Sequence, residues 1–287
     1  MRIVVTGASG RLGKAVGQHL AAHGHDVLGI DKVADPSVRP LWIGDLSLTG
    51  DLFEACAKAD AIVHLAAIQA PNLASDSVTF NNNVSATYNV FKVAADLRIR
   101  TVISASSIAA YGFLYAGIAF LPDYLPLDED HPCRPRDPYG LSKIVGETIA
   151  ASFAQQTGAS VVSLRIAGVN FDPTFGIIRE RMKNPRGRMP GFWSYVDARD
   201  VAEACRLALA LAPTDHHIFN VAAPTSNVLQ STDELLKQFL PAVRKRRPEL
   251  AGNWSGIDSG KAQRELGFQA EHVWERYLSR SDADDSA

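Results

Sequence analysis

The chain begins with two short apolar runs separated by an amphipathic segment. The runs, at residues 2–5 and 26–30, predict β-strands. Between them, Leu12, Val16 and Leu20 recur at a spacing of four residues, as on one face of a helix. The opening pattern therefore predicts a strand, a helix and a second strand.

The same alternation continues for most of the chain. Further apolar runs predict strands at residues 41–43, 61–67, 101–104, 161–165 and 217–221. Periodic segments predict helices at residues 49–59, 81–98, 138–156, 198–211 and 231–240, with a last helical turn or two at 260–266. This alternation predicts the α/β class: a doubly wound parallel sheet (Rossmann) with right-handed crossovers.

A glycine-rich turn joins the first predicted strand to the first helix. Its glycines, at positions 7, 10 and 13, lie in a loop one residue longer than the Gly-x-Gly-x-x-Gly fingerprint of dinucleotide-binding folds. There the glycines allow close approach to a pyrophosphate, and an acid about 20 residues on binds the adenine ribose. Asp31 stands at that distance. The turn predicts NAD as the cofactor. NADP is less favoured because Asp31 repels a 2′-phosphate, a preference that Lys32 and Arg11 soften.

Tyr139 and Lys143 lie four residues apart, on one face of a predicted helix. Ser107 follows the fifth predicted strand, at the sheet edge where a nicotinamide would lie. Removing a proton from an alcohol needs a base, and a nearby lysine and a positive nicotinamide favour the phenolate. We expect these charges to bring the pKa of Tyr139 toward neutrality, and Ser107 to bond the reacting oxygen.

Beyond residue 170 the alternation weakens. Residues 171–195 are loop-like and basic, and residues 241–256 are rich in proline and arginine. We expect residues 1–170 to form the Rossmann domain with the Ser/Tyr/Lys set. Residues 171–278 should form a small C-terminal substrate-binding cap, interleaved with the last sheet strands, and the acidic tail at 279–287 should be disordered.

Composition narrows the class of partner. The chain has 287 residues, is 46% hydrophobic and carries a net charge of −2, so neither nucleic acid nor an anionic membrane is an expected partner. Its three cysteines, Cys56, Cys133 and Cys205, are widely spaced, which argues against disulfides or a zinc site and for a reducing compartment. With no signal peptide and no long apolar run, we expect a cytoplasmic protein without a metal.

These residues give the chain a family resemblance. It resembles the extended short-chain dehydrogenases/reductases, the NAD-dependent epimerase/dehydratase family, from residue 1 to about residue 270. The resemblance rests on the motifs at residues 6–13, 31, 44–46, 64–67, 83–84, 106–107, 111–112, 138–143, 164–165, 195–197, 200–202 and 266–268.

The resemblance implies roles for individual residues. The implied cofactor-binding residues are Gly7, Ser9, Gly10, Arg11, Leu12, Gly13, Asp31, Lys32, Asp45, Leu46, Leu65, Ala66, Ala67, Tyr139 and Lys143. Asp45 and Leu46 would hold the adenine, Ala66 and Ala67 would line the pyrophosphate path, and Lys143 would bond the nicotinamide ribose. Asn83 would support the water network of the active site. His64 lies inside an apolar strand, so we interpret it as structural.

Two departures from the family pattern concern the substrate. The interval between residues 165 and 195 is short, and Gly191 stands where nucleotide-sugar members carry an arginine for the diphosphate. The segment 113–131, which we call the lid, is longer than usual and carries Phe113, Leu114, Tyr115, Phe120 and Tyr124. Both features are similar to the small sugar or uronate dehydrogenases of the group.

The basic residues leave alternatives open. Arg179, Arg181, Lys183, Arg186 and Arg188 either bind a carboxylate or phosphate of the substrate or form a solvated loop. The run at 244–247 is typical of surface charge, although Arg247 could still bind a phosphate.

Three functions follow in order of preference. The first is an NAD-dependent dehydrogenase acting on a hydroxyl or carbonyl of a sugar-like small molecule, and the second is a nucleotide-sugar 4-epimerase or dehydratase with tightly bound NAD. The third is a non-catalytic dinucleotide sensor, which would not need Ser107, Tyr139 and Lys143 together.

The helices at 81–98 and 139–156 are apolar on more than one side, which predicts a homodimer. Their apolar residues include Val84, Tyr88, Phe91, Ile144, Ile149 and Phe153.

Overall fold

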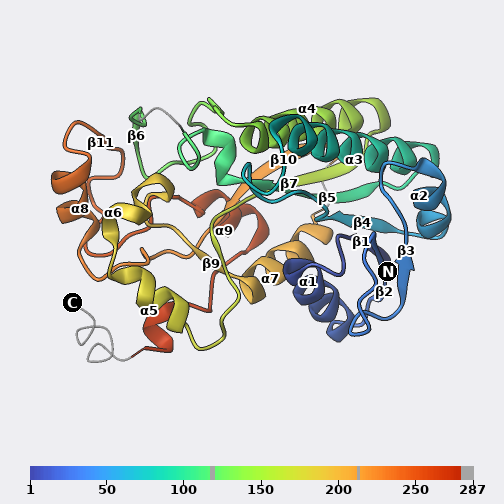
Figure 1. Ribbon diagram of the computed structural model, residues 1–287, viewed down its shortest axis with the longest axis horizontal. Coiled ribbons are helices and arrows are strands. Elements are labelled where there is room, and N and C mark those ends of the chain that lie inside the picture. The colour runs from blue at the N-terminus through green and yellow to red at the C-terminus, as the bar shows by residue number, and fades with distance from the viewer. Residues whose placement is uncertain (117–119, 212–213, 279–287) are drawn as a thin grey trace.

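A parallel sheet runs through the centre of the computed structural model, which describes residues 1–116, 120–211 and 214–278 (Figure 1). Within these residues the sheet consists of β1 (Arg2–Thr6), β2 (Asp26–Asp31), β3 (Leu41–Ile43), β4 (Ala61–His64), β5 (Thr101–Ser107), β7 (Ser160–Ile166) and β10 (His216–Val221). Their order is β10-β7-β5-β4-β1-β2-β3, and every neighbouring pair is parallel. The predicted doubly wound sheet is therefore confirmed.

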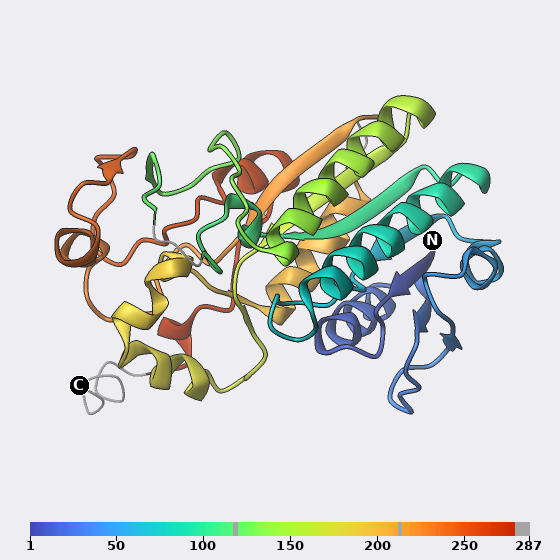
Figure 2. The same ribbon diagram turned by 45° about the horizontal axis from the view of Figure 1, so that its top comes forward.

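Helices cover both faces of this sheet (Figure 2). They are α1 (Arg11–Ala22), α2 (Thr49–Cys56), α3 (Asp76–Asp96), α4 (Pro138–Thr157), α7 (Ala198–Leu209) and α9 (Gly260–Leu266). The side chains of β1 alternate between the two faces, as a strand requires. Ile3 and Val5 pack with α1 and α7, whereas Val4 packs with α2, α3 and α4. Each such side chain contributes about 1.5–3 kcal/mol when it is fully buried.

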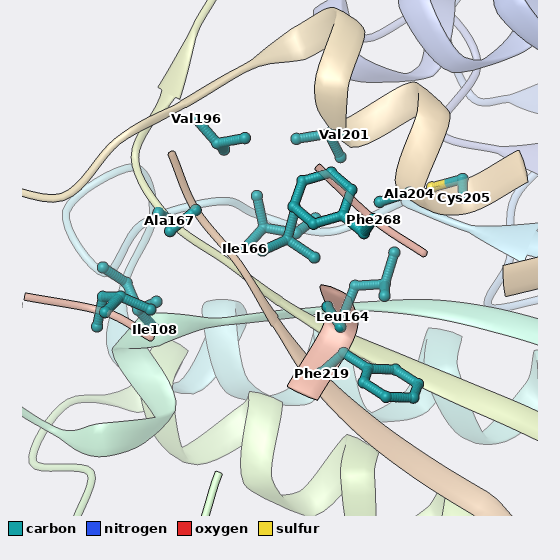
Figure 3. Packing of buried hydrophobic residues seen from close by; sticks show 14 of the residues in the cluster. Ile108, Leu164, Ile166, Ala167, Val196, Val201, Ala204, Cys205, Phe219 and Phe268 are labelled. Atoms are coloured by element: carbon teal, nitrogen blue, oxygen red, sulfur yellow. The ribbon is translucent and has the colours of Figure 1, made fainter. Parts of the chain in front are cut away.

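The face under α7 is densely packed (Figure 3). Val201 and Cys205 of this helix lie in one cluster with Leu164 of β7 and Phe219 of β10, all of them buried. On the opposite face, Phe91 of α3 and Phe153 of α4 lie in the core with their rings 5.1 Å apart. The outer side of α3 carries Tyr88, which is 55% exposed.

The remaining elements form a cap beyond the carboxyl ends of the strands (Figure 1). They are α5 (Gly176–Met182), α6 (Pro185–Arg188), α8 (Thr232–Phe239) and the turns η1 (Ile108–Tyr111), η2 (Met189–Gly191) and η3 (Trp274–Arg276). Two short parallel pairs join β6 (Tyr124–Leu125) to β11 (Arg244–Lys245) and β8 (Val169–Asn170) to β9 (Val196–Asp197). Phe175, Ile178 and Trp274 bury one another in a separate small core.

Several predicted boundaries were wrong. The loop predicted at 171–195 contains α5, α6 and η2, whose helices are too short to show an amphipathic period. The strand predicted at 61–67 ends at His64, and the helix predicted at 81–98 begins at Asp76. The predicted disorder of 279–287 concerns residues outside those that the structure describes. Along the described chain, no helix combines the length and apolarity needed to cross a membrane.

Candidate active site

A cavity of about 1250 Å³ opens at the carboxyl ends of the sheet strands. Every residue predicted to bind the cofactor lines it: Gly7, Ser9, Gly10, Arg11, Leu12, Gly13, Asp31, Lys32, Asp45, Leu46, Leu65, Ala66, Ala67, Tyr139 and Lys143. Ser107 lines the same cavity, whereas Asn83 does not. Its volume exceeds the range of about 300–1,000 Å³ usual for one small ligand, so it has room for a dinucleotide and a second molecule.

The glycine turn forms one wall of this cavity. Gly7 N–H donates to Ile30 O at 2.9 Å, and Gly10 N–H donates to Gly7 O at 3.0 Å, which folds the turn back onto β2. A Cβ atom on Gly13 would lie 2.1 Å from Gly7 O, so only glycine fits. Among the described residues no side chain caps α1, and its first turn carries no acid, so its first N–H groups can bind an anionic ligand.

Asp31 is held in place at the end of β2. One carboxylate oxygen accepts from Ser9 N–H at 3.0 Å and the other from Val33 N–H at 3.1 Å. Lys32 turns instead to Asp45, with its Nζ 3.1 Å from Oδ1. The Ser47 N–H and then Lys32 help to hold the pKa of Asp45 below its usual value. The positive charge next to Asp31 is thus paired with another acid.

His64 lies behind the cavity wall, as its apolar surroundings predicted. Its ring is buried, with one nitrogen 2.8 Å from the Thr6 hydroxyl and the other 3.1 Å from the Thr87 hydroxyl. Burial, and to a lesser extent the charge of Lys143, lower the pKa of His64 to about 3. A neutral histidine with both nitrogens bonded is a structural residue.

Tyr139 is positioned by the start of α4. Asp137 caps this helix by accepting from Gly140 N–H at 2.8 Å, and Pro138 occupies its first turn. A Cβ on Gly140 would lie 2.5 Å from Ala109 O, so glycine lets α4 approach the turn that follows β5. This approach brings Tyr139 beside Ser107.

In the protein alone, the pKa of Tyr139 is raised. The predicted lowering included the positive charge of the nicotinamide and stays a prediction. Burial raises that pKa to about 12, and only the Ser107 hydroxyl opposes the shift. Burial also lowers the pKa of Lys143 to about 8, with Glu147 opposing. Lys143 donates to Ala105 O at 2.8 Å, and its Nζ lies 5.4 Å from the centre of the Tyr139 ring. Burial is therefore the largest cause of both pKa shifts.

A buried ion pair beneath this site was missed by the sequence analysis. Glu147 accepts from Arg165 at 2.9 Å and 2.8 Å, and from the Ser106 hydroxyl at 2.6 Å. The pair joins α4 to β5 and β7 directly beside Ser107 and Lys143. A glutamate four residues after Lys143, together with an arginine inside an apolar strand, was the available signal.

Asn83 lies outside the cavity lining. Its side-chain amide accepts from Ile68 N–H at 2.8 Å and donates to Ile68 O at 3.0 Å. It also donates to the Ser142 hydroxyl at 3.2 Å. These bonds attach the chain after β4 to α4 and so shape the cavity from behind.

The described part of the lid closes one side of the cavity. Leu114 and Tyr115 line it, and the ring of Tyr115 meets that of Tyr139 edge-on at 6.1 Å. Phe113 stacks on Phe120 at 4.5 Å and meets Phe192 at 5.1 Å, so the lid packs against the cap.

The basic residues of the cap divide into two groups. Arg181 and Arg188 line a second hollow of about 490 Å³, and neither has an ion-pair partner among the described residues. Burial, then the charges of Arg188 and Arg11, lower the pKa of Arg181. In contrast, Arg247 pairs with Glu249 at 2.9 Å and Asp258 at 3.1 Å, and it lines neither hollow.

Comparison with known proteins gives matches over most of the chain. Residues 3–170 match the NAD dependent epimerase/dehydratase family. The chain is 33% identical over 186 residues to an L-arabinose 1-dehydrogenase (NAD(P)(+)) of Haloferax volcanii, covering 63% of this chain and 71% of that protein. It is 23% identical over 310 residues to a UDP-glucose 4-epimerase of Streptomyces lividans, covering 93% and 91%.

A solved structure shares the fold. A short-chain dehydrogenase/reductase superfamily protein from Agrobacterium tumefaciens with bound NAD superimposes with a TM-score of 0.74 and 21% identity. The match covers 100% of this chain and 96% of that one.

Proposed function

Because the chain belongs to the NAD dependent epimerase/dehydratase family, we propose that it is an NAD-dependent dehydrogenase of a sugar-like small molecule. It would act on a hydroxyl or carbonyl group of that substrate. One observation carries the proposal: Ser107, Tyr139 and Lys143 line the same cavity as the glycine turn and Asp31. The group proposed to transfer the proton and the glycine turn proposed to hold the dinucleotide therefore lie in the same cavity.

The residues present fit NAD. The first turn of α1 offers uncapped N–H groups to a pyrophosphate, and the contact between Gly13 and Gly7 leaves no room for a side chain. Asp31 is anchored by two backbone N–H groups and can accept from ribose hydroxyls. Lys32 is paired with Asp45, whereas Arg11 lines the cavity and can still soften the repulsion between Asp31 and a 2′-phosphate. We infer a preference for NAD over NADP.

When bound, NAD supplies the group that accepts or gives the hydride. Tyr139 would take the proton of the substrate hydroxyl, and Ser107 would hold the same oxygen by a hydrogen bond. Lys143 would stabilise the tyrosinate by its charge and bond the nicotinamide ribose. Asn83 would act indirectly, because its bonds to the Ile68 backbone hold the segment after β4 that lines the cavity.

The proposed substrate is compact. Leu114 and Tyr115 bring an apolar edge of the lid to within reach of Tyr139, and Arg247 is already bound to two acids. Arg181 and Arg188 line the second hollow and not the Tyr139 cavity, but Arg181 feels the charge of Arg11, which lines that cavity, so these two arginines could meet an anionic substituent that extends from it. Lys183 pairs with Glu180. A nucleotide-sugar 4-epimerase is the second candidate, because the same arginines could meet a diphosphate and a UDP-glucose 4-epimerase is among the relatives.

The wider organisation follows from the same proposal. Residues 1–170 would bind the cofactor, and residues 171–278 would bind the substrate.

A homodimer would cover the outer sides of α3 and α4, where Tyr88 and Leu141 are exposed. Sedimentation that shows only monomer at micromolar concentration would exclude this dimer. The wide spacing of three free cysteines, two of them buried, supports a cytoplasmic location.

Two tyrosines in one cavity provide the test. We expect Tyr139→Phe to bind NAD normally and to lose turnover by about 10²–10⁴-fold, since only the proton-transferring group is removed. Tyr115→Phe is the matched control, because Tyr115 lines the same cavity and should keep most of the wild-type rate. Equal losses in the two variants would refute the assignment of Tyr139 as the base.

The two candidate reactions differ in the fate of the cofactor. With NAD in excess and a panel of sugars, uronates and nucleotide-sugars, a dehydrogenase accumulates NADH. An epimerase returns the hydride and accumulates none, while the substrate is converted to its 4-epimer. Conversion of a UDP-sugar without NADH would therefore favour the second candidate.

A further inference from the structure

Two histidines and a glutamate meet where α1 packs beside α7 (Figure 1). His19 lies in the last turn of α1, His23 ends that helix, and Glu203 belongs to α7. One ligand atom from each of the three lies within 4.8 Å of the others. Imidazole nitrogens and a carboxylate oxygen are ligands of divalent transition ions.

The geometry is close to that of a metal site. Histidines four residues apart on a helix present their rings on one face, as in helical zinc motifs. The rings of His19 and His23 lie 4.3 Å apart, and His19 Nε2 is 2.8 Å from Glu203 Oε2. A zinc ion about 2.0–2.1 Å from both atoms would hold them roughly 3.3 Å apart, so this pair needs to open by about half an ångström. The ligand atom of His23, which lies within 4.8 Å of the other two, would have to move closer by rotation of its exposed side chain.

Neighbouring groups orient these ligands. His23 Nδ1 lies 2.8 Å from His19 O, and because a carbonyl only accepts, Nδ1 carries the proton and Nε2 keeps its lone pair for a metal. Arg206 donates to both oxygens of Glu203, at 2.7 Å and 2.6 Å, and fixes its rotamer. The carbonyl end of α1 adds a negative potential that favours a cation, and the charge of Arg206 opposes it.

We propose that His19, His23 and Glu203 bind one Zn²⁺ ion, with water in the remaining coordination position. The partial exposure of His19 and Glu203 leaves the site open to solvent. The cysteine spacing that argued against zinc concerned thiolate ligands and does not bear on this set. Because α1 begins at the glycine turn, roughly 12 Å along the helix from His19, the ion would clamp that helix to α7.

An ordinary ion pair between His19 and Glu203, already satisfied by Arg206, is the competing explanation. It leaves His23 only a bond to the His19 carbonyl at the helix end, and gives no role to His23 Nε2, which bonds to no group in the part of the chain that the structure describes. His23 therefore separates the two explanations. As an exposed residue at a helix end, it can be replaced without disturbing the core.

The test uses the full chain without a polyhistidine tag, with Zn²⁺ as the probe. We expect calorimetry to show one tight equivalent and thermal unfolding to shift upward by about 3 °C or more at saturating Zn²⁺. His23→Ala and Glu203→Gln should each weaken binding at least about tenfold and abolish the shift, at unchanged circular dichroism. Gln18→Ala, an exposed neighbour on α1, should behave as wild type, and Mg²⁺ should have no effect.

Two results would overturn the proposal. One is a wild-type protein that shows no response to Zn²⁺ at 100-fold molar excess. The other is binding of equal affinity and stoichiometry in wild type and His23→Ala, which would place the ion on other histidines or on Cys133. Because none of these residues lines the cofactor cavity, either result leaves the proposed dehydrogenase activity intact.

Discussion

Replacing Glu147 by methionine should be among the most destabilising single changes near the site. The side chains of Glu147 and Arg165 are only 7% and 6% exposed, and two hydrogen bonds of 2.8–2.9 Å join them. Removing one partner leaves a buried, uncompensated guanidinium, which typically costs about 3–5 kcal/mol. The Ser106 hydroxyl also loses its acceptor, at about 1 kcal/mol.

The double variant Glu147→Met/Arg165→Met tests whether the instability of Glu147→Met comes from the loss of the ion pair or from the buried guanidinium that is left without a partner. Because the double variant buries no unpaired ion, it should recover most of the free energy of unfolding that Glu147→Met loses. Recovery should be incomplete, because Arg165 also lies 4.9 Å from the centre of the Tyr111 ring, a contact of about 0.5–2 kcal/mol. Since the Ser106 hydroxyl also stays without its acceptor, we expect the double variant to be within about 3 kcal/mol of wild type and clearly more stable than Glu147→Met.

Urea unfolding at pH 7, followed by tryptophan fluorescence, measures these differences. Asp123→Ala is the control, since Asp123 pairs with Arg134 at the surface and should change the free energy of unfolding by only about 0–1 kcal/mol. A Glu147→Met variant as stable as this control, or a double variant no more stable than the single one, would refute the reasoning.

Three further predictions concern the cofactor, the substrate and pH. Asp31→Ser should raise kcat/KM for NADP at least about tenfold relative to NAD, and a wild-type enzyme that binds NADPH more tightly than NADH would contradict the role of Asp31. A free sugar acid such as galacturonate should have a higher kcat/KM than its UDP-linked form, and the opposite order would assign Arg181 and Arg188 to a diphosphate. Burial lowers the pKa of Lys143 from 10.5 to about 8, so between these values the unfolded chain binds more protons and this residue's contribution to stability rises with pH. The stability of wild type relative to Lys143→Met should therefore increase from pH 7 to pH 9.5 in urea unfolding, and a constant difference would exclude the shifted pKa.

The sheet could be predicted from the sequence because its signal is local. A fully buried parallel strand such as β7 is a continuous apolar run, and such runs alternate with periodic helices along the chain. The parallel order then brings the ends of β1, β2, β4 and β5 to one edge. For this reason the glycine turn, Asp31 and Ser107 could be expected to share a cavity before any distance was known.

Other features could not be predicted because they depend on contacts between distant segments. The two-residue strands β6 and β11 are paired across more than a hundred residues, and neither has a pattern of its own. Helix α6 is four residues long and held by the Asn184 side chain, which accepts from Gly187 N–H at 2.8 Å. The pKa of Tyr139 depends on how deeply it is buried, which its spacing from Lys143 does not reveal.

This division between local and distant signals also explains why the cofactor was easier to predict than the substrate. The cofactor wall comes from strand ends whose positions follow from the sheet. On the side proposed for the substrate, Leu114 and Tyr115 belong to the lid, whose far end is fixed by Arg246. The backbone N–H of Arg246 donates to Leu125 O at 2.8 Å, and its guanidinium pairs with Asp128 at 3.0 Å. Arg246 thus anchors the lid, whereas Arg247 pairs with Glu249 and Asp258. Under the proposed function, the shape of the substrate pocket would therefore depend on ion pairs well outside it. We expect that substrate preference in this chain can change without any change in the residues predicted to bind the cofactor.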